Sequence, residues 1–107
     1  MNGYQISFFT VHGHRHKGKP VGDWLVQLAK EMGLTGATLI SGSEGFGHHR
    51  RIHSVHFIEL TDQPLEVVMV VTTEEADRLF ERLKREGIRL FYARTPAEFG
   101  VLGGQGN

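Results

Sequence analysis

The chain has 107 residues, of which 39% are hydrophobic and 22% are charged, and its 12 basic and 12 acidic residues cancel. These totals predict a single globular domain with a modest core, and they argue against whole-chain disorder and a general nucleic-acid binder. The absence of cysteine excludes disulfides, and no run approaches the roughly 20 apolar residues of a membrane span. We therefore expect a soluble, cytoplasmic protein.

The first half of the chain predicts a strand, a polar loop, a helix and a second strand. Residues 4–11 alternate in polarity and are rich in aromatic and β-branched side chains, as is typical of a strand. Residues 12–19 form a polar loop, and Pro20 suits the first turn of a helix, where its missing N–H costs nothing. Apolar residues then recur in one helical stripe over residues 21–32, and residues 37–40 form the second strand.

The second half of the chain predicts two further strands separated by a helix. Residues 53–58 look extended, and residues 65–71 are so continuously apolar that they predict a strand buried on both faces. Thr72 and Glu75 have the spacing of a capping box, which opens the second helix. After that helix, residues 88–93 form the last strand.

The predicted order β-α-β-β-α-β indicates an α+β, ferredoxin-like split sheet: four antiparallel strands with two helices on one face. We expect this domain to occupy residues 1–98, followed by a loose, glycine-rich tail over residues 99–107. In this topology the loops after the first strand, the second strand and the second helix lie at one end of the sheet. Two segments that carry basic but no acidic residues, 13–22 and 45–58, should therefore converge in space.

The central loop, residues 42–56, concentrates glycine, arginine and histidine between two apolar runs. Glycines let backbone amides approach a ligand closely, and the neighbouring side chains supply positive or switchable charge. We interpret the loop as an anion-binding or partner-binding site; the alternative is a solvated surface loop whose glycines serve only turns. The candidate residues are Gly42, Gly45, Phe46, Gly47, His48, His49, Arg50, Arg51 and His53.

Residues 13–19 match most of a phosphate-loop signature, but Pro20 stands where a serine or threonine would hold magnesium. Lys19, beside a helix N-terminus, remains a candidate for binding an anion. The histidines of the central loop are not spaced with a nucleophile or acid as a triad, so we expect a pH-sensitive ligand site and no enzyme.

His12, His14 and His16 alternate along the chain, so an extended backbone would point all three imidazoles to one side. Three such nitrogens suit zinc, copper or nickel. The alternative is a histidine-rich loop that binds metal only adventitiously.

Several spaced blocks follow one another in order along the chain: His16-x-Gly18-Lys19-Pro20, Gly33-Leu34-x-Gly36-Ala37-Thr38, Gly42-x-x-Gly45-Phe46-Gly47 and Ile52-His53. Together they resemble the PII-like signalling proteins catalogued as a domain of unknown function, and the resemblance spans nearly the whole chain. The resemblance implies a ferredoxin-like homotrimer that binds adenine nucleotides in clefts between subunits. The central loop would then be the T-loop, which reports occupancy to a partner such as a membrane transporter or a metabolic enzyme.

Carried over by position, residues 45–49 fall on the base of the T-loop, which contacts the nucleotide, and Thr38 matches a position in the second strand. The chain has His48 and His49 where true PII proteins have Arg-Gln, and residues 85–88 lack their phosphate-holding loop. These departures favour AMP, ADP or a cyclic nucleotide over a triphosphate.

Two other functions stay open. The architecture is also similar to the CutA divalent-ion tolerance proteins, which would make the three alternating histidines metal ligands. The trimer could instead be an adaptor for a membrane partner, docked through the basic central loop.

Overall fold

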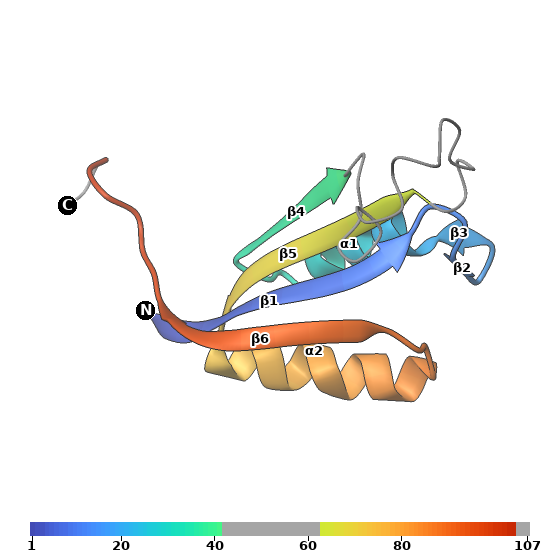
Figure 1. Ribbon diagram of the computed structural model, residues 1–107. Helices are drawn as coiled ribbons and strands as arrows, with labels where there is room; N and C mark the ends of the chain where they lie inside the picture. The colour runs from blue at the N-terminus through green and yellow to red at the C-terminus, as the bar shows by residue number, and fades with distance from the viewer. Residues whose placement is uncertain (42–62, 105–107) are drawn as a thin grey trace.

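The computed structural model describes residues 1–41 and 63–104, which form a four-stranded antiparallel sheet, two helices and a small hairpin (Figure 1). The sheet order is β4-β5-β1-β6, with both helices packed on one face. This arrangement confirms the predicted ferredoxin-like fold. The elements are β1 (Asn2–Val11), β2 (Arg15–His16), β3 (Lys19–Pro20), α1 (Val21–Glu31), β4 (Gly36–Ser41), β5 (Pro64–Thr72), α2 (Thr73–Glu86) and β6 (Phe91–Glu98).

The strand register fixes which loops share an end of the sheet. Val11, the last residue of β1, pairs with Pro64, the first of β5. The last residue of β4 pairs with Leu65, and the first of β6 pairs with Phe9. The β1–α1 connection and the α2–β6 turn therefore lie at one end, as predicted. The second basic segment, residues 45–58, lies outside the described residues.

The core lies between the sheet and the two helices. It is built from alternate residues of β1 and β5, from the α1 stripe that the sequence predicted, and from one face of α2. Burial follows the period of two along each strand and the helical repeat along each helix. Its fully or nearly fully buried members include Ile6, Phe8, Val21, Leu25, Leu28, Val67, Met69, Val71, Ala76 and Leu79.

The face of the sheet that carries no helix is partly apolar, and we call it the open face. Along β5, every second residue is buried against the helices, while Val68 and Val70 between them are only half-buried. The predicted burial of β5 on both faces is thus wrong for the single chain, because both helices pack on the same side. Ile40, 45% exposed, and Phe91, 73% exposed, lie on the open face by their register with β5 and β1.

The ends of α2 follow the sequence closely. Thr72 accepts a hydrogen bond from the Glu75 N–H, and the Glu75 carboxylate accepts one from the Thr72 N–H, which confirms the capping box. Gly87 ends the helix in the left-handed conformation at φ +69°. Glu75 also accepts hydrogen bonds from Thr35, so it joins the start of α2 to the α1–β4 turn.

The last strand differs from its prediction, since β6 runs from Phe91 to Glu98 and not over residues 88–93. Ile88 and Leu90 instead pack against the core from the connection before the strand. Pro96 is tolerated inside β6 because an edge strand leaves one row of its backbone groups unpaired. Neither helix of the described ranges is long and apolar enough to cross a membrane.

Candidate functional site

The β1–α1 connection, predicted as a polar loop, contains a small hairpin formed by β2 and β3 (residues 15–20). Its turn places Lys17 at φ +53° and Gly18 at φ +79°, and the Arg15 guanidinium donates a 2.8 Å hydrogen bond to the Gly18 carbonyl across it. Left-handed backbone is uncommon for a residue with a side chain. The conformation of Lys17 therefore has a cost that other contacts of this hairpin must offset.

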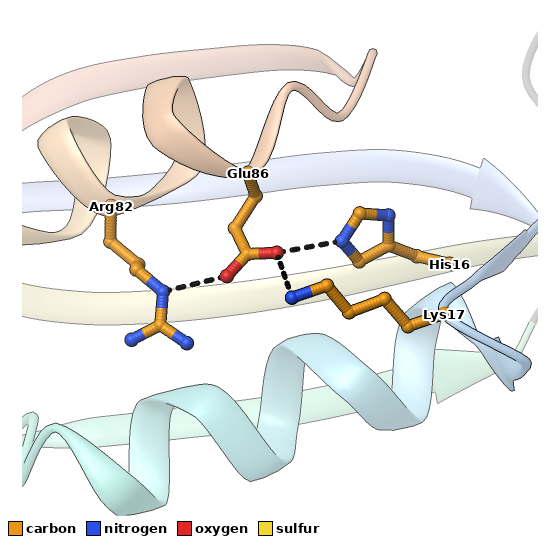
Figure 2. Close-up of polar contacts among 4 residues, drawn as sticks. All are labelled: His16, Lys17, Arg82 and Glu86. Atoms are coloured by element: carbon orange, nitrogen blue, oxygen red, sulfur yellow. Dashed lines mark hydrogen bonds and ion pairs between the residues drawn. The ribbon is translucent and has the colours of Figure 1, made fainter.

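Those contacts converge on one carboxylate, that of Glu86 at the end of α2 (Figure 2). One carboxylate oxygen lies 2.9 Å from His16 Nε2 and 2.9 Å from Lys17 Nζ, and the other lies 2.9 Å from Arg82 Nε. The Glu86 side chain is only 8% exposed. Hydrogen bonds from His16, Lys17 and Arg82 hold the pKa of this carboxyl at about 2, well below its usual 4.5.

The hairpin also contacts α1. The His16 ring meets the Trp24 ring edge-on, with centroids 4.5 Å apart and an angle of 67° between the planes. Trp24 is 9% exposed and is the single tryptophan of the chain. His16 thus lies between the indole of α1 and the carboxylate of α2, and it joins the hairpin to both helices.

The prediction that His12, His14 and His16 point to one side requires an extended backbone, and a turn at residues 12–13 interrupts it after the first strand. His14 Nδ1 is 2.9 Å from the Thr10 hydroxyl, whereas His16 is bonded to Glu86. Within residues 1–41 and 63–104, no three histidine, aspartate or glutamate side chains lie close enough together to hold a metal ion.

Lys19 and Thr38 are the predicted ligand-binding residues that the structure describes. Lys19 is exposed on β3, at the end of the sheet where β4 ends at residue 41 and where residue 63 precedes β5. Thr38 is exposed on the open face, paired with Val68 in β5. The other predicted residues lie outside the described part of the chain: Gly42, Gly45, Phe46, Gly47, His48, His49, Arg50, Arg51 and His53.

Arg15, Lys17 and Lys19 alternate along the hairpin, and among the described residues Glu86 is the acid that forms a salt bridge with it. Within the described part of the chain, the hairpin therefore carries more positive charge than the carboxylate that contacts it, which favours an anionic ligand. A shallow depression of about 450 Å³ lies at the opposite end, lined by residues such as Asn2, Thr73 and Glu98, and it includes none of the predicted site residues.

Sequence reasoning missed Glu86. Three acid–base pairs in α2 have the i, i+4 spacing: Glu74 with Arg78, Glu81 with Arg85, and Arg82 with Glu86. The ion pair within the helix joins Arg82 to Glu86. One signal was present in the sequence: a glutamate as the last helical residue opposes the helix dipole, so it needs a compensating partner.

Comparison with known proteins identifies the family. A family described as "Uncharacterized ACR, COG1993" (DUF190) matches residues 3–88. A UPF0166 protein of Aquifex aeolicus (strain VF5) is 30% identical over 80 residues, which cover 74% of this chain and 76% of that protein.

Solved structures share the fold at low identity. A PII-like signalling protein structure from Thermus thermophilus has a TM-score of 0.62 at 16% identity, covering 91% of this chain and 88% of the other. CPII of Thiomonas intermedia K12, bound to ADP, AMP and acetate, has a TM-score of 0.59 at 15% identity, covering 94% and 90%. The chain shares the fold of these PII-like proteins, as the resemblance predicted, and its match over residues 3–88 shows that it belongs to the DUF190 family.

Proposed function

We propose that the protein is a non-enzymatic, cytoplasmic PII-like regulator that binds an adenine nucleotide, such as AMP, ADP or a cyclic nucleotide. The observation that carries this proposal is the placement of Arg15, Lys17 and Lys19 at one end of the sheet, where the central loop begins and ends. The structural neighbour CPII, which has the same fold, is bound to ADP and AMP. Phosphate groups are the anions that arginine and lysine side chains best recognise.

The central loop would report the bound nucleotide to a partner, either a membrane transporter or a metabolic enzyme. Residues 45–51 would contribute backbone amides and arginine side chains to the ligand. This role follows the family resemblance of the sequence blocks, and the position of the loop ends beside the β2–β3 hairpin supports it.

The working assembly in this proposal is a homotrimer with the nucleotide between subunits. The open face supports self-association, because it leaves Ile40, Val68, Val70 and Phe91 at least partly exposed on a single chain. Exposed apolar side chains gathered on one face of a sheet are typical of an interaction site. Sedimentation equilibrium should then give about 36 kDa, three times the chain mass of 12.0 kDa.

Nucleotide binding is tested by thermal shift and calorimetry on metal-stripped protein, with AMP, ADP, ATP and cyclic AMP run against zinc, copper and nickel. A nucleotide at 100 times its dissociation constant should stabilise the fold by about 2.7 kcal/mol. Lys19→Ala should weaken this binding, whereas Lys30→Ala, which removes the same charge from an exposed position on α1, should not. No response to any nucleotide at millimolar concentration would refute the proposal, and a response to metal alone would favour an ion-binding protein.

A further inference from the structure

Glu86 places a negative charge at the C-terminal end of α2, where the helix dipole makes it unfavourable. The last turn of α2 carries Lys84 and Arg85, which complement the negative end of the helix dipole, yet the final residue is an acid. Its side chain is largely withdrawn from solvent, at 8% exposure. A carboxylate in this position is unfavourable unless donors surround it, and an exception of this kind often marks a functional constraint.

The donors that surround it tie two distant parts of the chain together. Arg82 belongs to the same helix, but His16 and Lys17 come from the β2–β3 hairpin, 70 positions upstream of Glu86 in the case of His16 (Figure 2). The hairpin has two residues in each strand and one pair of facing strands, so its ladder alone gives it little stability. Its position against the helices therefore depends on side-chain contacts.

We propose that Glu86 is the positioning residue of the β2–β3 hairpin, which it holds against α2 so that Lys19 is presented in advance to an anionic ligand. This inference rests on the proposed nucleotide site. His16 and Lys19 face each other across the hairpin, so fixing His16 also fixes the backbone from which Lys19 projects. The left-handed conformation of Lys17 fits the same role, because the turn directs its amine to the Glu86 carboxylate.

A pre-organised hairpin improves affinity by lowering the conformational cost of binding. If one more side chain must be ordered at the moment of binding, affinity falls by roughly 2- to 12-fold. Glu86→Gln keeps the size of the side chain and removes its charge, so it should weaken AMP or ADP binding by that factor. Glu81→Gln is the matched control, since it makes the same change at an exposed position of the same helix.

Trp24 provides a spectroscopic signal that is independent of the ligand. The His16 ring covers one edge of this single tryptophan, so a loosened hairpin should raise the acrylamide quenching of its fluorescence in ligand-free protein. Thr72→Ala controls for general destabilisation, because it removes the cap at the other end of α2 and should leave the quenching unchanged.

The outcomes separate the two proposals. Wild-type protein that binds no nucleotide refutes the proposed function, whereas the quenching comparison still tests the anchoring of the hairpin. Quenching in Glu86→Gln equal to that in Glu81→Gln overturns the inference. Increased quenching with unchanged affinity in a protein that binds nucleotide also overturns it, because the hairpin would then be loosened without consequence for the ligand. Increased quenching together with the roughly 2- to 12-fold loss supports it.

Discussion

Replacing Gly3 by alanine should separate the central strand pair at one point, because there is no room for a Cβ. Gly3 lies in β1 opposite Thr72 in β5 and Ala97 in β6. A Cβ built there would lie 1.9 Å from the Val71 carbonyl oxygen, where real Cβ atoms essentially never approach closer than 3.0 Å. The obstructing atoms are backbone, so no side chain can rotate away, and the strands must move apart by about 1.1 Å, the difference between these distances.

A displacement of this size would stretch a ladder hydrogen bond of about 2.9 Å past the range of a good bond. Overpacking of a well-packed site costs about 1–3 kcal/mol, and for a domain of this length each kcal/mol lowers Tm by about 4–8 °C. We therefore expect Gly3→Ala to lower Tm by roughly 5–20 °C. Urea unfolding followed by Trp24 fluorescence gives the free energy of unfolding. Wild type and variants are measured at the same protein concentration, so that self-association contributes equally to each value.

Gly36→Ala is the matched control. Gly36 is also a strand glycine, but a Cβ there meets nothing within 4 Å and its φ is not positive. Alanine at such a position typically stabilises by about 0.4–1 kcal/mol through the unfolded state. If Gly3→Ala were as stable as Gly36→Ala to within about 0.5 kcal/mol, the steric argument would be refuted.

Three further outcomes follow from the two ends of α2. The pKa of Glu86, about 2 in the fold against a usual 4.5, means that its contribution to stability is complete above about pH 4.5 and is lost as the pH falls toward 2. The stability difference between wild type and Glu86→Gln should therefore shrink over that range of an acid titration, and a constant difference would contradict it. Thr72→Ala should cost about 0.5–2 kcal/mol in urea unfolding by removing the cap, and an unchanged midpoint would argue against the capping box. Gly87→Ala should cost about 1–2 kcal/mol because φ is +69° there, whereas Gly100→Ala, with open space and no positive φ, serves as its neutral reference.

The sequence predicted those elements whose structure depends on interactions between residues close together in the chain. The existence of the β5 strand, the apolar stripe of α1 and the Thr72 capping box each depend on residues close together in the chain, and all three were predicted correctly. The burial of β5 on both faces was not, because it depends on where the helices pack. Partial burial raises the pKa of the Glu75 carboxyl. Hydrogen bonds from Thr72 and Thr35 and the charge of Arg78 together lower it by more, so the net pKa lies below its usual value. The link to Thr35 crosses 40 residues, and no spacing could predict it.

The candidate site was predicted less well, because its side chains are organised by contacts between distant segments. The alternation of His14 and His16 could not predict their partners, which are the Thr10 hydroxyl for His14 and the Glu86 carboxylate for His16. The last strand was predicted to begin too early in the chain. Ile88 and Leu90 are apolar because they pack against the core from the connection before β6, and not because they belong to the strand. The topology did predict that the β1–α1 connection and the α2–β6 turn lie at the same end of the sheet, since that follows from strand order alone.

The sheet order has a consequence for the synthesis of this chain on the ribosome. β1 is made first, but both of its neighbours in the sheet, β5 and β6, belong to the second half of the chain. β1 therefore acquires its first sheet neighbour when β5, which ends at Thr72, has emerged, and its second when β6, which ends at Glu98, has emerged. At a translation rate of about 5–20 residues per second this interval lasts several seconds. Of the described elements made before β5, α1 contacts β1, so Ile6 and Phe8 lack the core residues of β5 and α2 during this interval.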